Sequence, residues 1–271
     1  MSISQTSHIR LRLLFSCAVL LIFTGCTTSR LTTNYPAVPG FNLKNSDAKA
    51  VTIADEVMAK LGGWENWAKT RYVTWKFFGR RLHVWDKWTG NIRVERSDEV
   101  ILMNLNTKTG RAWKAGSEIT HPDSLAKPLQ FGYEAWINDS YWMFMPYKLK
   151  DNGVTLKYVR EDTMRGGRPA DILSLTFEKV GVTPENKYLI YVDKETKLVG
   201  QWDYFEKATD VKPRTSTPWT NWQRYGNIFL SDERGRGKHT DLAVFDELPV
   251  SVFQNPAPVD WAQIKASTKS N

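Results

Sequence analysis

The sequence predicts a mainly β, α+β protein: a curled antiparallel sheet, or incomplete β-barrel, with an N-terminal helix and a mid-chain helix filling its concave face. Two observations lead to this fold. Apolar residues follow a helical period before Gly62, and from Arg71 onward they follow a period of two, broken by short turn signals. Connections this short favour antiparallel neighbours.

The N-terminal helix is expected over Asp47–Leu61. Its apolar residues recur at steps of three and four, at Ala50, Ile53, Ala54, Val57, Met58 and Leu61. Ser46 or Asp47 can cap its start, and Gly62 and Gly63 can end it, because glycine adopts a left-handed backbone without steric cost. Trp64 and Trp67 continue the apolar spacing for one more short turn.

Five short strands are expected next. They cover Arg71–Gly79, Leu82–Trp88, Ile92–Arg96, Val100–Asn106 and Arg111–Ala115. A helix over Leu125–Ile137 then interrupts the strands, and Asn138 and Asp139 are expected to end it. The dense apolar segment Tyr141–Pro146 is expected to be a strand closed by Pro146.

Six strands are expected in the second half of the chain. They cover Thr155–Arg160, Ile172–Glu178, Lys187–Asp193, Leu198–Lys207, Trp219–Tyr225 and Thr240–Phe245. The polar turn at Asp193–Lys197 marks the clearest hairpin, since an apolar run leads into it and another leads out.

The beginning of the chain has the pattern of an export signal. Arg10 and Arg12 precede a largely apolar run over Leu13–Phe23, which is shorter than the about 17–25 residues that span a bilayer. The sequence at 23–26, Phe-Thr-Gly-Cys, resembles the lipobox of bacterial lipoproteins. That resemblance implies cleavage before Cys26, lipidation of its thiol and acylation of the new amino terminus. The alternative is an ordinary secretory signal with an incidental cysteine.

This reading divides the chain into four parts. Residues 1–25 are expected to be a cleaved lipoprotein signal peptide, 26–45 a flexible tether, 46–250 a single domain and 251–271 a C-terminal tail. Cys17 leaves with the signal, so neither a disulfide nor a cysteine metal site is expected in the mature chain. The formal net charge is +8 with interspersed charges, and nucleic acid is not expected as a partner outside the cytoplasm.

No catalytic motif is present in the sequence. His83, His121 and His239 are far apart, and adjacent carboxylates such as Glu161 and Asp162 point to opposite faces of a strand. There is no Gly-x-Ser-x-Gly, no His-Glu-x-x-His and no phosphate-binding glycine loop. The sequence therefore predicts neither an enzyme nor a metal or other cofactor.

Aromatic residues are abundant, with 12 Trp, 10 Tyr and 12 Phe. An aromatic-lined concavity is a natural site for an apolar ligand, although a heavily aromatic core without a ligand is the alternative. Strand alternation directs Trp75 and Phe77 inward, opposite Lys76, and Trp202 and Tyr204 inward, opposite Asp203. The predicted ligand-binding residues are Trp75, Phe77, Trp142, Phe144, Trp202 and Tyr204.

Three segments resemble the LolA/LolB superfamily of lipoprotein-sorting and lipid-carrying half-barrels. They are Tyr-Val-Thr-Trp-Lys-Phe-Phe-Gly at 72–79, Tyr-Trp-Met-Phe-Met-Pro at 141–146, and the strand–Asp-x-x-Thr–strand hairpin at 188–199. The segments 77–90 and 146–154 are also similar to an uncharacterised lipoprotein family of Bacteroidetes-type bacteria. The resemblance covers roughly 46–250 and implies a half-barrel without catalytic residues, on the periplasmic side of the outer membrane.

The leading hypothesis is a membrane-anchored envelope lipoprotein that binds a lipid or a lipoprotein acyl chain without catalysis. The first alternative is a structural or assembly protein of the outer membrane whose core is filled by its own side chains. The second is a sugar-binding or hydrolytic protein that uses exposed Trp residues. The polarity and volume of the cavity separate these hypotheses.

Overall fold

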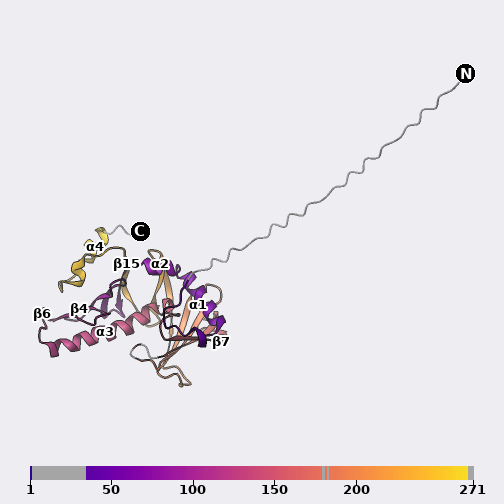
Figure 1. Ribbon diagram of the computed structural model, residues 1–271, viewed down its shortest axis with the longest axis horizontal. Helices are drawn as coiled ribbons and strands as arrows, with labels where there is room; N and C mark the ends of the chain where they lie inside the picture. Colours follow the sequence, from indigo (N-terminus) through magenta and orange to yellow (C-terminus); the bar gives the residue numbers. More distant parts are fainter. Residues whose placement is uncertain (2–34, 179–180, 182, 268–271) are drawn as a thin grey trace. The chain divides into compact units, whose positions relative to one another are not determined.

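The structure is a computed structural model of the 271-residue chain and describes residues 1, 35–178, 181 and 183–267. Residues 2–34, which include most of the expected signal peptide and Cys26, lie outside the described residues. The described residues from Tyr35 onward form one compact unit. Figure 1 shows the strands of this unit with the long helix α3 (Pro122–Phe144) beside them.

The first sheet is seven-stranded and antiparallel, in the order β15-β1-β2-β3-β4-β5-β6. Its strands are β1 (Tyr72–Phe77), β2 (Arg81–Asp86), β3 (Asn91–Arg96), β4 (Glu99–Asn104), β5 (Gly110–Lys114), β6 (Ser117–Glu118) and β15 (Thr240–Phe245). The five strands expected between Arg71 and Ala115 are confirmed within about two residues. Gly79, in the turn between β1 and β2, and Gly90, in the turn between β2 and β3, both have a positive φ, which glycine adopts without steric cost.

The other strands form a five-stranded sheet, β11-β10-β9-β8-β7, and a three-stranded sheet, β12-β13-β14. Their bounds are β7 (Val154–Thr163), β8 (Pro169–Phe177), β9 (Lys187–Asp193), β10 (Val199–Phe205), β11 (Thr215–Pro218), β12 (Thr220–Tyr225), β13 (Ile228–Arg234) and β14 (Gly237–Lys238). All pairings are antiparallel. The hairpin at Asp193–Lys197 is confirmed, whereas β11, β13 and β14 were not expected from the sequence.

The expectation of one curled sheet is not met, because the described strands divide into three open sheets. The break between the second and third sheets falls at Trp219, between β11 and β12. Its side chain is 1% exposed, packs on Trp202 and lies beneath the Arg234 guanidinium, 3.6 Å from the ring centroid. The chain thus passes from the second sheet to the third at the buried Trp219 ring.

The N-terminal helix is confirmed as α1 (Ala48–Lys60), with its apolar stripe buried. Asp47 occupies the N-cap position, but its carboxylate accepts hydrogen bonds from the Tyr158 amide and the Lys157 ammonium instead of capping α1. The turn expected at Trp64 and Trp67 is α2 (Trp64–Lys69). The short helices η1 (Leu43–Asn45), η2 (Met145–Tyr147), η3 (Val250–Phe253) and α4 (Trp261–Ser267) complete the described helices.

The expected strand Tyr141–Pro146 is wrong. Helix α3 runs from Pro122 through Asn138 and Asp139 to Phe144, and η2 follows it. Asp139 does not end the helix, because its buried carboxylate binds Arg81 and His83 of β2 and so holds the next turn against the first sheet. Trp142 and Phe144 therefore lie on a helix, where residues two apart point in different directions.

The two faces of the first sheet are covered by different parts of the chain. The first half of α3 packs against Ile92, Val94 and Ile101, with Gly132 nearest to β4. On the opposite face, the C-terminal segment 248–264 packs against Tyr72, Val84 and Phe245. Arg93 of β3 clamps that segment: its buried guanidinium donates to the carbonyls of Val252, Asn255, Pro256 and Ala257.

Both ends of the expected domain continue into ordered structure. Tyr35, within the expected tether, is 4% exposed, and its hydroxyl donates to the Tyr147 carbonyl at 3.1 Å. Residues 35–45 thus lie against the domain. Within the expected C-terminal tail, α4 buries Ile264 beneath the first sheet.

Candidate functional site

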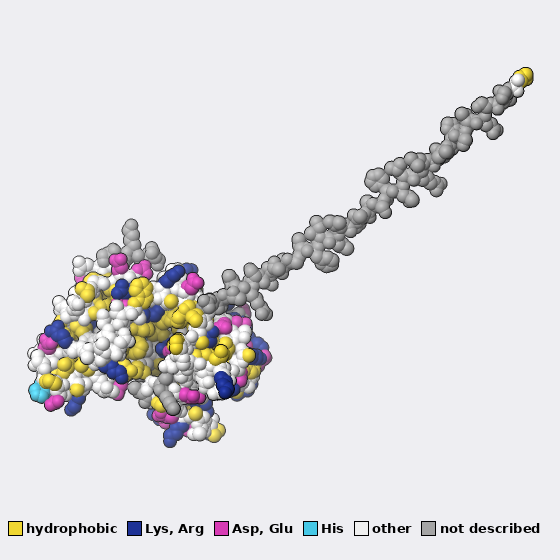
Figure 2. All heavy atoms as spheres, viewed as in Figure 1, with side chains coloured by type: hydrophobic (Ala, Val, Ile, Leu, Met, Phe, Trp, Pro, Cys, Tyr) yellow, Lys and Arg dark blue, Asp and Glu magenta, His cyan; other side chains and the backbone are white. Residues whose placement is uncertain are grey.

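A cavity of about 490 Å³ lies between the second half of α3 and the strands β8, β9 and β10. This α3 cavity is lined by Tyr133, Trp136, Ile137, Asn138, Ser140, Tyr141, Trp142, Lys148, Asp151, Asn152, Val154, Phe177, Thr183, Asn186, Tyr188 and Tyr204, among others. Figure 2 shows hydrophobic side chains gathered over the middle of the face along which α3 runs in Figure 1. The cavity has the size of a small-molecule pocket.

Aromatic rings form a large part of the cavity wall and pack against one another. Tyr188 stacks on Trp202 with ring centroids 4.7 Å apart, and Trp142 meets Trp202 edge to face at 4.6 Å. Tyr188 also contacts Tyr141 and Tyr204, each at 5.3 Å. Such pairs add stability beyond their buried area, so the wall is held in place without a ligand.

Strand pairing and helix spacing explain how these rings meet. Tyr188 of β9 lies opposite Tyr204 of β10, so both side chains stand on the same face of the second sheet. From the other side, α3 contributes Tyr133, Ile137 and Tyr141 at steps of four residues. One helical stripe and one strand pair therefore build the site.

The cavity is electrostatically neutral. Burial raises the pKa of Tyr141 and of Tyr188, so both hydroxyls stay protonated at physiological pH. Lys148 and Asp151 lie at its edge and form an ion pair at 2.6 Å. The Tyr141 hydroxyl has no hydrogen-bond partner. The arrangement suits an uncharged, largely apolar ligand surface.

The structure brings together three of the six predicted ligand-binding residues. Trp142 and Tyr204 line the α3 cavity, and the fully buried Trp202 supports its wall from beneath. Phe144 lines a separate, smaller cavity. Trp75 lies in the core, stacked on His83 at 4.6 Å, and Phe77 is buried against Phe78 and His239.

Sequence reasoning missed Tyr141, Tyr188 and Ile137 as cavity residues. A signal for each was present. Tyr188 alternates with Ile190 and Val192 on the apolar face of its strand, and Tyr141 extends the stripe of Tyr133 and Ile137 by one turn. The stripe was overlooked because the helix was expected to end at Asn138.

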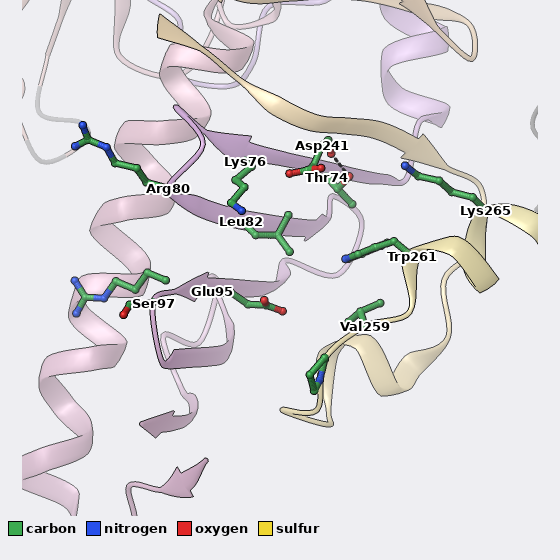
Figure 3. A pocket seen from close by; sticks show the side chains of 12 residues that line it. Thr74, Lys76, Arg80, Leu82, Glu95, Ser97, Asp241, Val259, Trp261 and Lys265 are labelled. Atoms are coloured by element: carbon green, nitrogen blue, oxygen red, sulfur yellow. Dashed lines mark hydrogen bonds between the residues drawn. The ribbon is translucent and has the colours of Figure 1, made fainter. Parts of the chain in front are cut away.

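A second cavity, of about 360 Å³, lies on the outer face of the first sheet. Figure 3 shows Lys76 and Leu82 on one side of it and Val259 and Trp261 of the C-terminal segment on the other. Lys76 thus faces away from the core, as strand alternation indicated. Charges of both signs line this cavity, with Lys76 and Lys265 beside Glu95 and Asp241.

His83 and Asp139 form a histidine–carboxylate pair in the interior of the protein. His83 and Asp139 are joined by a hydrogen bond at 2.7 Å, but both side chains are fully buried and Arg81 holds the carboxylate at 2.7 and 2.8 Å. In the described ranges, no group of three or more His, Cys, Asp or Glu side chains is placed to hold a metal ion. Likewise, no described helix is long and apolar enough to cross a bilayer.

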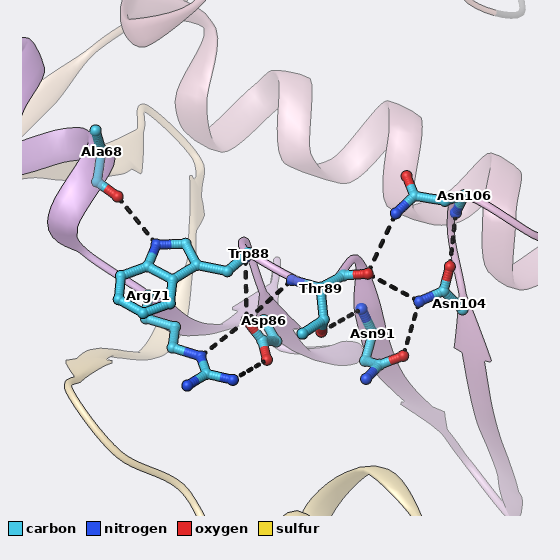
Figure 4. A network of polar contacts seen from close by, with 8 residues as sticks. All are labelled: Ala68, Arg71, Asp86, Trp88, Thr89, Asn91, Asn104 and Asn106. Atoms are coloured by element: carbon cyan, nitrogen blue, oxygen red, sulfur yellow. Dashed lines mark hydrogen bonds and ion pairs between the residues drawn. The ribbon is translucent and has the colours of Figure 1, made fainter.

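Trp88, in the turn between β2 and β3, is the exposed tryptophan among the described residues. Its indole N–H donates to the Ala68 carbonyl at 3.1 Å, and its ring centroid lies 5.0 Å from the Arg71 guanidinium (Figure 4). The nearby Asp86 carboxylate binds Arg71 and the amides of Trp88 and Thr89. The oxygen lone pairs of Asp86 are therefore occupied by hydrogen bonds from Arg71 and from the turn. This leaves the Asp86 carboxylate poorly placed to act as an acid in hydrolysis.

No protein-family model and no curated protein matches this chain. Among solved structures, a DUF1329 family protein from Desulfovibrio piger aligns with 76% of this chain and 97% of its own, at 13% identity and a TM-score of 0.40. MucB aligns with 69% of this chain and 66% of its own, at 13% identity and a TM-score of 0.26. The MucA/MucB complex of Pseudomonas aeruginosa aligns with 57% and 51%, at 16% identity and a TM-score of 0.22.

Proposed function

We propose that this protein is a non-enzymatic binder of a lipid or acyl chain, held in the α3 cavity. The observation that carries the proposal is the cavity itself: about 490 Å³, walled by aromatic rings and lined by neutral hydroxyls. Each CH₂ group removed from water contributes about 0.8 kcal/mol, so an alkyl chain of several carbons gains a useful binding energy there. A core filled entirely by its own side chains would leave no such space.

We further propose that acylated Cys26 anchors the chain in the cell envelope, at the outer membrane facing the periplasm. The export signal, the lipobox at 23–26 and the absence of an aspartate after Cys26 support this placement. The half-barrel resemblance of the sequence agrees with it. An anchored protein that binds acyl chains would serve in lipid or lipoprotein trafficking.

Uptake of an alkyl probe by Tyr204→Glu tests the binding proposal. Tyr204 is half-buried at the cavity wall, so a carboxylate there puts a charge against the alkyl chain, and uptake of a fluorescent fatty acid is expected to fall at least about tenfold. Tyr225→Glu is the matched control, since Tyr225 is half-buried in β12 outside the cavity. Equal uptake by both variants and the wild type would place the ligand elsewhere.

Mass spectrometry of protein gently extracted from its native membrane gives an independent measurement. A co-purifying lipid in the wild type that is lost in Tyr204→Glu is the expected result. If no lipid co-purifies and the fatty acid is not taken up, the assembly role with a self-filled core replaces the binding proposal.

A further inference from the structure

A smaller cavity of about 120 Å³ adjoins the α3 cavity. Ser140, Lys148 and Asp151 line both, so the two cavities are neighbours that share these residues. The smaller cavity is otherwise lined by Val38, Trp64, Trp67, Trp85, Lys87, Phe144 and Tyr147. Its walls come largely from α2, β2 and the end of α3, and neither Tyr188 nor Tyr204 lines it.

Lys87 is the unusual group in the smaller cavity. Its ammonium donates to the carbonyl oxygens of Trp67 and Thr70, the latter at 3.0 Å, and lies 3.5 Å from the centroid of the Trp67 ring. No carboxylate contacts it in the described part of the chain. An ammonium has three N–H donors, and two carbonyls leave one of them available.

The surroundings of Lys87 favour an incoming anion. Burial alone lowers the pKa of Lys87 to about 7, because no neighbouring acid offsets the loss of water. Lys148 and Asp151, the other charged groups lining the smaller cavity, neutralise each other at 2.6 Å. A partly desolvated cation without a counter-ion is costly, and an anion beside it would recover that cost.

We propose that the smaller cavity receives the carboxylate of a fatty acid whose alkyl chain occupies the α3 cavity, with Lys87 as its counter-ion. This inference rests on the proposed acyl-binding function and adds the chemical class of the ligand. It follows from the juxtaposition of a neutral aromatic cavity with a cavity that holds one uncompensated ammonium. An acyl chain with an uncharged head group gains nothing from Lys87.

Equilibrium binding of radiolabelled palmitic acid and 1-hexadecanol to the full-length protein tests the inference. The two probes have chains of equal length and differ in head-group charge. The wild type is expected to bind the acid about tenfold or more tightly than the alcohol, as one hydrogen bond between charged groups would give. If neither probe binds, the acyl-binding function fails; if both bind equally, only the role of Lys87 fails.

The variant Lys87→Met tests whether Lys87 causes the preference for palmitic acid over 1-hexadecanol. It keeps the length of the side chain and removes its charge, so binding of the acid is expected to weaken about tenfold while binding of the alcohol is unchanged. Lys60→Met is the matched control, since Lys60 is exposed and lines neither cavity, and it should retain the preference for the acid. Retained preference in Lys87→Met overturns the inference, and unchanged alcohol binding shows that the variant is folded.

Discussion

His239 is a histidine that the fold keeps neutral. Its ring is fully buried, its Nδ1 accepts a hydrogen bond from the Phe78 amide at 3.4 Å, and its Nε2 has no partner. Burial, reinforced by the positive charge of Arg234, lowers the pKa of His239 to about 3, and the Asp139 carboxylate and the Trp142 backbone only partly offset this. The His239 ring is therefore stable in the protein interior only in its neutral form, with one of its two nitrogens protonated.

The pH dependence of stability follows from this shift. Because the pKa is lower in the folded state, the unfolded chain binds the extra proton between about pH 6.5 and pH 3, and stability falls as the pH falls through that window. When the pH is lowered from 7 to 5, protonation of His239 in the unfolded chain is expected by itself to lower the free energy of unfolding by about 2 kcal/mol. Urea unfolding at the two pH values measures it.

His239→Asn should flatten that pH dependence by the same amount. The control is His121→Asn, because His121 is exposed and its replacement should leave the pH dependence of the wild type in place. A His239→Asn variant that loses as much stability on acidification as the wild type would contradict the burial of a neutral ring.

Gly132 sets how closely α3 approaches the first sheet. A Cβ atom at this position would lie 3.1 Å from a methyl group of Ile101 and 3.1 Å from the Met103 sulfur, both on β4. Gly132→Leu is therefore expected to overpack the contact and lower the free energy of unfolding by about 1–3 kcal/mol in urea unfolding. Gly166→Leu is the control, since nothing lies within 4 Å of a Cβ there, and it should change stability by less than about 0.5 kcal/mol.

The elements that the sequence predicted well are those whose pattern is local. Helix α1 has an unbroken stripe and a Gly-Gly end, and the hairpin at Asp193–Lys197 has alternation on both sides of a turn. The end of α3 could not be placed, because Asn138 and Asp139 are common helix terminators. Here Asp139 is satisfied by Arg81 and His83, far away in the sequence.

The candidate site was partly predictable for the same reason. Strand alternation placed Trp202 and Tyr204 correctly on one face, whereas treating 141–146 as a strand assigned Trp142 and Phe144 to one wall. The helix instead sends them to different cavities. The break between the second and third sheets had no local signal, since it falls at Trp219, whose ring is buried against Trp202 of β10.

At the scale of the whole molecule, the described unit begins at Tyr35, nine residues after Cys26 in the sequence. A tether of that length spans about 30 Å when extended, so an acylated Cys26 would hold the domain close to the membrane. Cys26→Ala is expected to abolish incorporation of radiolabelled palmitate and to leave the precursor uncut on a gel. Cys17→Ala is the control, because Cys17 lies within the expected signal. Palmitate incorporation into Cys26→Ala would contradict the anchor.

The pairing of β1 with β15 determines when the first sheet can be completed. Tyr72 pairs with Phe245, and the segment clamped by Arg93 comes later still in the chain. A chain synthesised from its amino terminus reaches these residues long after it has made β1. Until then β1 is an open edge that can pair with other chains, and the apolar side chains of Tyr72 and Val84 lie uncovered. A fragment that stops before Thr240 is therefore expected to keep this edge unpaired and to aggregate.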